Sequence, residues 1–397
     1  MSQGPSDKIG VTTAAIVGMN AMIGAGIFAL PTLLAGAVGP AGILSVAFVA
    51  GAVWCMAQSF ARMAQLYPQE GSFYTYARQW GGHTAGLMAS GAYLVGLLIA
   101  MGLLAHCAGE HFNVSLPFYT SATWGIITLA TLTLLNMLGV SLSEIGQQIL
   151  IILTVAPLLA TSIMCFTKMQ ISNLVPFAPH GVSSIFDATR IAAFGFFGFE
   201  ASASLFSVIK DPEKNLPKAI TLSVIAVSAL YLLFVSALIL AVPLEIFSQN
   251  NGPISSSLQE IFPHQQWILT GIHVASLSAI LGTLHSMIWS SGAMLLSFLK
   301  KLRNRTTQKL LANGVINNST AVLLIGIAIY ISFITLTNKM FFNLTALCLL
   351  FAFTCATIPL ILRKQEWQSG QNYITIAGFL TAGIIAYFAL TDLFAGF

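Results

Sequence analysis

Charged residues are scarce in this chain, and their scarcity indicates its class. Asp, Glu, Lys and Arg together make up 7% of the 397 residues, and hydrophobic residues make up 56%. Soluble proteins carry roughly 25% charged residues. Apolar blocks of about 20 residues recur along the chain, and each is long enough to cross ~30 Å of hydrocarbon. Alternating segments of ~10 residues, which a membrane β-barrel needs, are missing. The sequence therefore predicts an all-α polytopic membrane protein.

Motifs for metal binding, catalysis and nucleotide binding are missing as well. The five cysteines form no C-x-x-C pair and no metal-ligand spacing, which indicates free buried thiols. No H-E-x-x-H motif, no pair of intramembrane acids and no nucleotide-binding fingerprint appears. We therefore expect neither an enzyme nor an ATP-driven pump, and no cofactor or metal. The net charge of +4 comes from Lys and Arg in a few short loops, which is typical of membrane topology and not of nucleic-acid binding.

Eleven membrane spans are predicted from the apolar blocks. A short polar lead, residues 1–10, precedes them, and because no cleavage site follows a short apolar core we expect an uncleaved first span. The spans cover residues 11–36, 41–66, 84–107, 120–139, 145–167, 184–209, 218–242, 268–299, 318–337, 342–362 and 373–395.

Basic residues gather in alternate loops, those after the second, sixth, eighth and tenth spans. The loops on the opposite side carry only Lys168 and Lys339. By the positive-inside rule the N-terminus is cytoplasmic, and eleven spans then place the C-terminus outside. We expect the protein to be integral to a bacterial inner (plasma) membrane. The basic loop residues are Arg62, Arg78, Lys210, Lys214, Lys218, Lys300, Lys301, Arg303, Arg305, Lys309, Arg363 and Lys364.

The stretch N-A-M-I-G-A-G-I-F-A-L-P (20–31) lies inside the first predicted span. Close helix packing is one interpretation of its glycines. However, Gly24 and Gly26 tolerate backbone angles that other residues resist, and Pro31 follows within two turns, so we expect the helix to open there. Freed backbone is tolerated in a membrane only where it lines a cavity or meets a ligand. The restarting half-helix suits a carboxylate and the ending half suits an ammonium, and an α-amino acid carries both.

A second interruption is predicted in F-G-F-F-G-F-E-A-S-A-S (194–204), where Gly195 and Gly198 fall inside the sixth span. Interrupted helices at corresponding positions of two halves indicate a transporter site. We therefore expect two five-span repeats, residues 11–167 and 184–362, and one extra span in residues 373–397. The loop after the second span is cytoplasmic and its counterpart after the seventh span is external, so the repeats are inverted.

Four segments resemble the amino acid–polyamine–organocation superfamily. I-G-A-G-I-F (23–28) and G-F-F-G-F-E-A (195–201) resemble its unwound first and sixth helices. Y-P-Q-E-G-S-F-Y-T-Y-A-R (67–78) and K-D-P-E-K-N-L-P-K-A (210–219) resemble two of its cytoplasmic loops. The likeness covers roughly residues 10–305. It implies the five-plus-five inverted-repeat fold with discontinuous first and sixth helices, and amino-acid transport by alternating access.

The resemblance also implies roles for the two breaks. The backbone of Gly24, Ala25 and Gly26 would take the substrate carboxylate, and the carbonyls of the helix ends would take its ammonium. The predicted substrate site comprises Met22, Ile23, Gly24, Ala25, Gly26, Phe194, Gly195, Phe196, Phe197 and Gly198. Most relatives have twelve spans and some carry a Lys in the fifth, whereas 149–157 has none and Thr154 lies near that place. The coupling ion, H⁺ or Na⁺, and the oligomeric state therefore stay open.

Glu200 is the clearest ionisable residue inside a span. A buried carboxylate is costly unless it is neutralised or paired, so Glu200 is either a proton-coupling residue or a structural acid that binds freed backbone. Met101 and Trp289 are further pocket candidates. Ser290 and Ser291 are candidates for a sodium site, although serines in such helices commonly bond their own backbone. The histidines at 106, 273 and 285 are expected to be hydrogen-bonded structural residues.

Substrate preference is inferred from the shortage of acids. Apart from Glu200 no span offers a clear carboxylate for a cationic side chain, and the candidate residues are aromatic or Met, so we expect a neutral, apolar amino acid. Two alternatives stay open. One is a cationic amino-acid or polyamine exchanger of the same fold, because aromatic faces and carbonyls also hold cations. The other is a non-transporting amino-acid sensor.

Overall fold

The computed structural model describes residues 8–249, 254–335, 338–362 and 371–395, and these residues are almost entirely helical. Extended pairing in this part of the chain is limited to one isolated bridge. In chain order the α-helices are α1 (Val11–Met22), α2 (Gly26–Val38), α3 (Gly42–Leu66), α4 (Ser72–Ser115), α5 (Ser121–Met137), α6 (Val140–Thr167), α7 (Ser183–Asp187), α8 (Thr189–Phe194), α9 (Pro212–Ala241), α10 (Leu244–Gln249), α11 (Ile254–Ile261), α12 (Gln266–Lys301), α13 (Arg305–Ala312), α14 (Asn318–Thr335), α15 (Asn338–Leu362) and α16 (Gln371–Ala395). Three 3₁₀ segments, η2 (Gly39–Ala41), η3 (Ile171–Leu174) and η4 (Ala201–Val208), complete the list.

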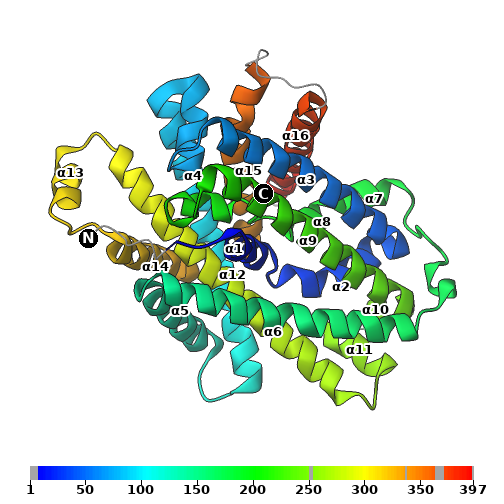
Figure 1. The fold of residues 1–397 in the computed structure, drawn as a ribbon. Coiled ribbons are helices and arrows are strands. Elements are labelled where there is room, and N and C mark those ends of the chain that lie inside the picture. The colour runs from blue at the N-terminus through cyan, green and yellow to red at the C-terminus, as the bar shows by residue number, and fades with distance from the viewer. Residues whose placement is uncertain (1–7, 250–253, 336–337, 363–370, 396–397) are drawn as a thin grey trace.

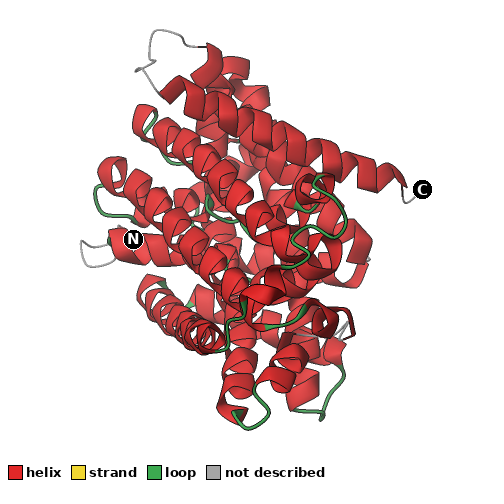
Figure 2. Cartoon of the chain, turned by 90° about the vertical axis from the view of Figure 1, so that its right-hand side faces the viewer, coloured by secondary structure: helices red, strands yellow, loops and turns green. Residues whose placement is uncertain are grey.

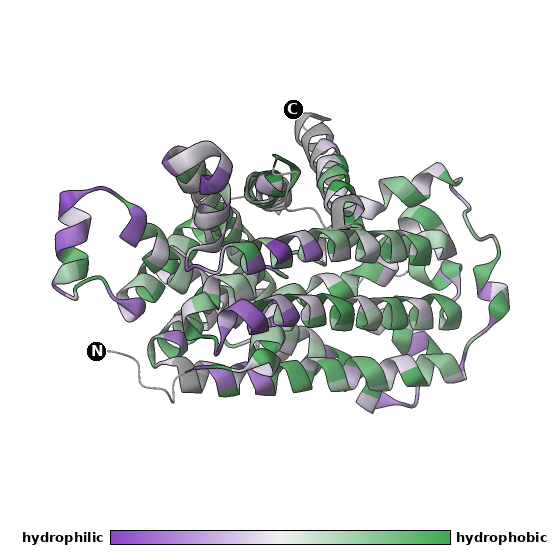
Figure 3. Ribbon diagram, turned by 45° about the horizontal axis from the view of Figure 1, so that its top comes forward, coloured by the Kyte–Doolittle hydropathy of each residue, from purple (hydrophilic) through white to green (hydrophobic). Residues whose placement is uncertain are grey.

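The length and polarity of these helices fit a membrane. Six described stretches are long and apolar enough to span one, namely Gly26–Leu66, Ser72–Ser115, Ser143–Thr167, Pro212–Ala241, Gln266–Lys301 and Asn318–Thr335. Four shorter apolar helices, Val11–Met22, Ser121–Met137, Leu347–Leu362 and Tyr373–Ile384, accompany them. Hydrophilic residues gather near helix ends and on α13, whereas the middle parts of the long helices are apolar (Figure 3). Figure 2 shows helices packed side by side and joined by loops.

Each predicted span has a helical counterpart, and the boundaries differ most at the third. The predicted loop at 67–78 is helical from Ser72 onward, so α4 begins twelve residues before the predicted span. Gly82, with φ of 66°, divides α4 into a short leading helix and the long span, because only glycine adopts such a backbone angle without strain. The predicted ninth span ends at residues 336–337, which lie outside the described residues.

The centre of the molecule is built around α1 (Figure 1). This helix packs against α6, α9, α12 and η4, and eight of its twelve residues are buried. The helices α14, α15 and α16 lie further out, with α15 against α4 and α16 against α3 and α15. A broken helix in this position is shielded from lipid by its neighbours, as backbone without internal hydrogen bonds requires.

The segment that leads into α1 is tied to the end of the sixth span. Ile9 pairs with Ile209 in a parallel bridge. The Ile9 N–H donates to the Val208 carbonyl at 2.8 Å, and the Lys210 N–H donates to the Ile9 carbonyl at 2.9 Å. The first and sixth spans are therefore joined at this end by backbone alone.

Candidate functional site

The first span is interrupted at the predicted glycines. Helix α1 ends at Met22, Ile23 leaves the helical region with φ of −80° and ψ of 81°, and α2 begins at Gly26. The backbone N–H groups of Ala25, Gly26 and Ile27 have no acceptor among the described residues. Three unbonded donors at a helix N-terminus form a site that favours an anion.

The sixth span is interrupted beside the first. Helix α8 ends at Phe194, and the chain continues as the 3₁₀ segment η4 from Ala201. Gly198 has φ of 116°, and a Cβ placed on it would lie 2.5 Å from the Ala21 carbonyl oxygen. A Cβ on Gly26 would lie 3.5 Å from the Gly195 Cα. The two breaks therefore touch, backbone against backbone, because glycine occupies at least one side of each contact.

Tyr231 of α9 joins the carbonyl ends of both breaks. Its hydroxyl lies 3.0 Å from the Met22 carbonyl oxygen and 2.9 Å from the Gly195 carbonyl oxygen. Its ring packs edge-on against Phe196 with centroids 4.9 Å apart. One hydroxyl proton serves one acceptor at a time, and each carbonyl oxygen has two lone pairs, so both carbonyls keep acceptor capacity. Sequence reasoning missed Tyr231, because an isolated tyrosine in an apolar span carries no local signal.

Thr283 of α12 is the corresponding hydroxyl at the first break. It lies 2.7 Å from the Asn20 carbonyl oxygen and 3.1 Å from that of Ile23, as well as 3.0 Å from that of Ala279 on its own helix. Four oxygens thus converge on one point. The predicted Ser290 instead donates to Met287 of its own helix at 3.2 Å, and the Ser291 hydroxyl is buried without a partner among the described residues. Thr283 was missed by the sequence reasoning.

A buried amide pair fixes the last turns of α1. The Asn20 amide donates to the Gln147 side-chain oxygen at 2.6 Å and to its carbonyl oxygen at 2.9 Å. Ser286 donates to the same side-chain oxygen at 2.7 Å. In α6 it is therefore Gln147 that bonds α1 near the break, whereas Thr154 bonds the Leu150 carbonyl of its own helix.

Glu200 is buried at 4% exposure directly after the sixth-span break. Its carboxyl lies beside the backbone N–H groups of Gly198 and Glu200 itself and faces the Tyr93 hydroxyl. Neither Glu200 Oε2 nor the Tyr93 hydroxyl has a hydrogen bond of normal geometry within the described residues. Buried oxygens in folded proteins rarely stay unbonded. The carboxyl thus lies beside freed backbone of its own segment and keeps one oxygen available.

A small hollow of about 10 Å³ adjoins Glu200, which is room for a single water at most. Apart from Glu200 its lining is apolar, with Phe197 and Phe199 on one side and Met56 and Leu349 among the others. Phe196 is fully buried and Phe197 is partly exposed. A ligand the size of an amino acid therefore requires these side chains to move apart.

The remaining candidates lie in the core without a demonstrated role. Met101 and Trp289 are 0% and 2% exposed, and both stay predictions. The histidines have hydrogen-bond partners, as expected: His106 contacts the Phe333 carbonyl, His273 contacts Ser115, and His285 lies between Asn136 and the Ser143 carbonyl. The five cysteines are free.

A membrane protein whose first and sixth spans break at touching, buried points belongs by its architecture to the transporters with discontinuous helices. Solved structures confirm the five-plus-five inverted-repeat fold. MhsT in complex with L-phenylalanine matches with a TM-score of 0.67 and 14% identity over 96% of this chain and 98% of that one. Mhp1, a nucleobase-cation-symport-1 family transporter, matches with a TM-score of 0.61 and 13% identity over 98% and 93%.

The family follows from the sequence itself. The amino acid permease family model matches residues 9–397, so the chain belongs to this family and to the amino acid–polyamine–organocation superfamily. The branched-chain amino acid permease BcaP of Bacillus subtilis (strain 168) is 27% identical over 297 residues, 69% of this chain and 62% of BcaP. The putrescine transporter PotE of Haemophilus influenzae (strain ATCC 51907 / DSM 11121 / KW20 / Rd) is 27% identical over 266 residues, 65% of this chain and 61% of PotE. Each alignment spans less than two thirds of the relative.

Proposed function

We propose that this protein is a secondary active transporter that moves a neutral, apolar amino acid across the plasma membrane by alternating access. The observation that supports this proposal most directly is the close approach of the breaks in the first and sixth spans. Unbonded N–H groups at the start of α2 lie next to the carbonyl ends of α1 and α8, with Gly26 against Gly195. The carboxylate would take the N–H groups of Ala25 and Gly26, and the ammonium would take carbonyls near Met22, Ile23, Phe194 and Gly195.

The charge around the breaks supports a neutral substrate. Glu200 is an acidic residue there, and its carboxyl lies beside the N–H groups of its own segment. The hollow beside it is otherwise apolar, so a substrate side chain that enlarged this space would meet Phe197, Met56 and Leu349. An aliphatic or aromatic side chain gains from such burial about 1.5–3 kcal/mol.

A cationic amino-acid or polyamine exchanger is the alternative, and the similarity to PotE supports it. In that case Glu200 Oε2, which lacks a bond of normal geometry, would face the cationic group. A non-transporting sensor is the second alternative, and it would bind an amino acid without moving it.

The experiment combines binding with transport. Purified protein is heated with each of the twenty amino acids, putrescine and agmatine, and the compounds that raise its melting temperature are then tested for counterflow in proteoliposomes. Stabilisation and counterflow by leucine, phenylalanine or methionine support the proposal. Stabilisation by arginine or putrescine alone favours the exchanger, binding without counterflow favours the sensor, and no stabilisation by any compound contradicts all three.

Coupling is tested at Thr283. If Na⁺ couples transport, the oxygens of Thr283, Asn20 and Ile23 are its ligands, because carbonyl and hydroxyl oxygens converge there. Thr283→Val should then abolish the stimulation of uptake by sodium over choline, while Ser290→Ala, whose hydroxyl bonds its own helix, should retain it. If uptake by the unsubstituted protein does not depend on sodium, sodium coupling is contradicted. Proton coupling through Glu200 is then the alternative that remains.

We also propose that the two repeats, residues 11–167 and 184–362, move against each other around the breaks. The N-terminus lies in the cytoplasm and the C-terminus after the eleventh span lies outside. The positive-inside distribution of basic loops supports this orientation.

A further inference from the structure

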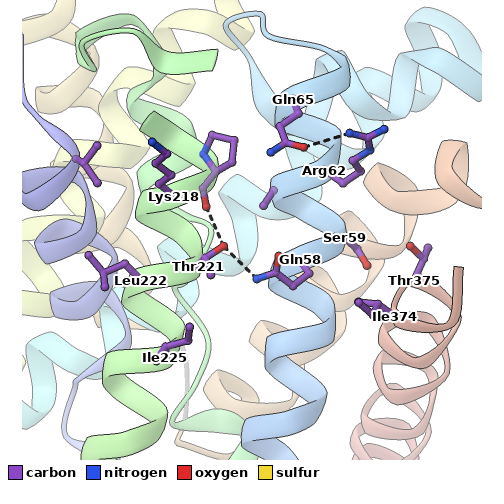
Figure 4. A pocket seen from close by; sticks show the side chains of 13 residues that line it. Gln58, Ser59, Arg62, Gln65, Lys218, Thr221, Leu222, Ile225, Ile374 and Thr375 are labelled. Carbon is purple, nitrogen blue, oxygen red and sulfur yellow. Dashed lines mark hydrogen bonds between the residues drawn. The ribbon is translucent and has the colours of Figure 1, made fainter. Parts of the chain in front are cut away.

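A second pocket opens between α3, α9 and α16, at the end of α3 and α9 that adjoins the basic loops (Figure 4). Its volume is about 550 Å³, within the ~300–1,000 Å³ typical of small-molecule sites. None of the residues that line it belongs to the predicted substrate site.

The loop end of this pocket is cationic. Arg62 of α3 and Lys218 of α9 are its two charged lining residues, and no lining residue is acidic. The Arg62 guanidinium donates to the Gln65 side chain at 3.3 Å, which leaves most of its five donors available. Neither cation forms an ion pair within the described residues. Two cations at one pocket mouth that form no ion pair among the described residues attract an anion.

The other end of the pocket is apolar and faces outward. Leu222 and Ile225 of α9 are 49% and 51% exposed, and Ile374 of α16 lies opposite them across the pocket. Between the two ends, the Gln58 amide donates to the Thr221 hydroxyl at 3.0 Å, and that hydroxyl donates to the Pro217 carbonyl at 3.0 Å. These bonds fix α3 against α9, so the pocket is a built feature of the fold.

We propose that this pocket binds an anionic phospholipid of the cytoplasmic leaflet. Arg62 and Lys218 contact the headgroup phosphate, and one acyl chain lies along Leu222, Ile225 and Ile374. The order of the lining, cationic at the loop end and apolar toward mid-membrane, matches the order of phosphate and tail in a lipid. Basic pockets between spans on this side of a membrane suit anionic headgroups. Because three helices form the wall, the bound lipid would hold α16 against α3 and α9.

Native mass spectrometry of the purified full chain tests this proposal. After delipidation the protein is supplied with phosphatidylglycerol or phosphatidylcholine of equal chain length. We expect one phosphatidylglycerol to stay bound and phosphatidylcholine to be lost. R62Q combined with K218Q should lower retention at least tenfold. R303Q combined with K309Q, which removes two exposed cations outside the pocket, should leave it unchanged. If the unsubstituted protein retains phosphatidylglycerol and phosphatidylcholine equally, the proposal is overturned whatever the variants show.

A second experiment distinguishes a phospholipid from a soluble phosphate compound as the ligand of the pocket. Phosphatidylglycerol should raise the melting temperature of the unsubstituted protein, and glycerol 1-phosphate at the same concentration should not, because it lacks the tail. The charge-preserving pair R62K and K218R should keep the stabilisation, which separates loss of charge from loss of fold. Equal stabilisation by glycerol 1-phosphate would assign the pocket to a free phosphate compound and overturn the lipid assignment.

Discussion

At the scale of single residues, Glu200 is a buried acid whose hydrogen bonding is incomplete within the described residues. Its carboxyl lies beside the N–H groups of Gly198 and of Glu200 itself, while Oε2 and the Tyr93 hydroxyl opposite lack bonds of normal geometry within the described residues. The position beside freed backbone is what a structural acid needs. The incomplete bonding is what a group that binds and releases a proton needs.

Substitution of Glu200 separates these two roles. Glu200→Gln keeps an oxygen that accepts from the freed N–H groups, so it should fold and lose little stability, whereas Glu200→Ala leaves buried donors unbonded at about 1–3 kcal/mol. If Glu200 also carries the coupling proton, uptake by the unsubstituted protein rises as external pH falls, and Glu200→Gln flattens that profile. Proteoliposome uptake between pH 5 and 8 measures this. An unchanged profile in Glu200→Gln assigns the residue a structural role alone.

Gly198 is a position that tolerates a side chain poorly. A left-handed backbone with φ of 116° strains any other residue by about 1–3 kcal/mol, and a Cβ would approach the Ala21 carbonyl to 2.5 Å. Gly198→Ala should therefore lower the melting temperature by several degrees and remove substrate-induced stabilisation. Gly51→Ala is the matched control, because it lies in a regular helix with nothing within 4 Å of its Cβ position. Equal behaviour of the two variants contradicts the close approach of the breaks.

At the scale of helices, the site consists of two interruptions held together by side chains of intact neighbours. Tyr231 comes from α9 and Thr283 from α12, and both helices continue regularly past the breaks. Regular helices thus hold the non-helical backbone of the breaks in place.

Tyr231→Phe tests whether the two breaks act as a unit. The ring contact with Phe196 remains, and the bridge between Met22 and Gly195 is lost. We expect the variant to fold and its substrate affinity to fall about tenfold, which corresponds to ~1.4 kcal/mol. Tyr330→Phe, on the exposed face of α14, is the control. Thermal-shift titration with the preferred amino acid measures both, and an unaltered affinity in Tyr231→Phe contradicts the bridge as a functional element.

The positions of the breaks could be predicted from the sequence, and their supporting side chains could not. Gly24, Gly26 and Gly198 act on their own backbone, so their effect is local and visible in a short stretch. The roles of Tyr231 and Thr283 depend on the register between helices that lie far apart in the chain. Because hydroxyl residues are common in these spans, nothing distinguishes the two that reach the breaks from those that bond their own helix.

At the scale of the whole molecule, the positions of the spans could be predicted from the lengths of the apolar blocks. The part of α4 before Gly82 could not be predicted in this way. Ser72–Ser115 carries Arg78, Gln79 and other polar residues before Gly82, so a hydropathy argument begins the span too late. The proposed orientation in the membrane depends on which loops carry the basic residues. Two of these basic residues, Arg62 and Lys218, also line the pocket between α3, α9 and α16.

Cysteine labelling in intact cells tests the orientation. His180 lies in the exposed loop after α6, and Thr306 lies on exposed α13. With the N-terminus in the cytoplasm, a membrane-impermeant maleimide should label His180→Cys in intact cells and Thr306→Cys only after permeabilisation. The unsubstituted chain gives the background from its own thiols. The reverse pattern would invert the proposed orientation.

The bridge between Ile9 and Ile209 has a consequence for the transport cycle. Two backbone hydrogen bonds, at 2.8 and 2.9 Å, fasten the segment before α1 to the end of η4 on the side where Lys210 lies. We expect a path for solute toward that side to part these two segments, so that the bridge would open when the candidate site becomes accessible from that side. Spin labels on the two segments would then report a short separation while the bridge is formed and a longer one after its hydrogen bonds have broken.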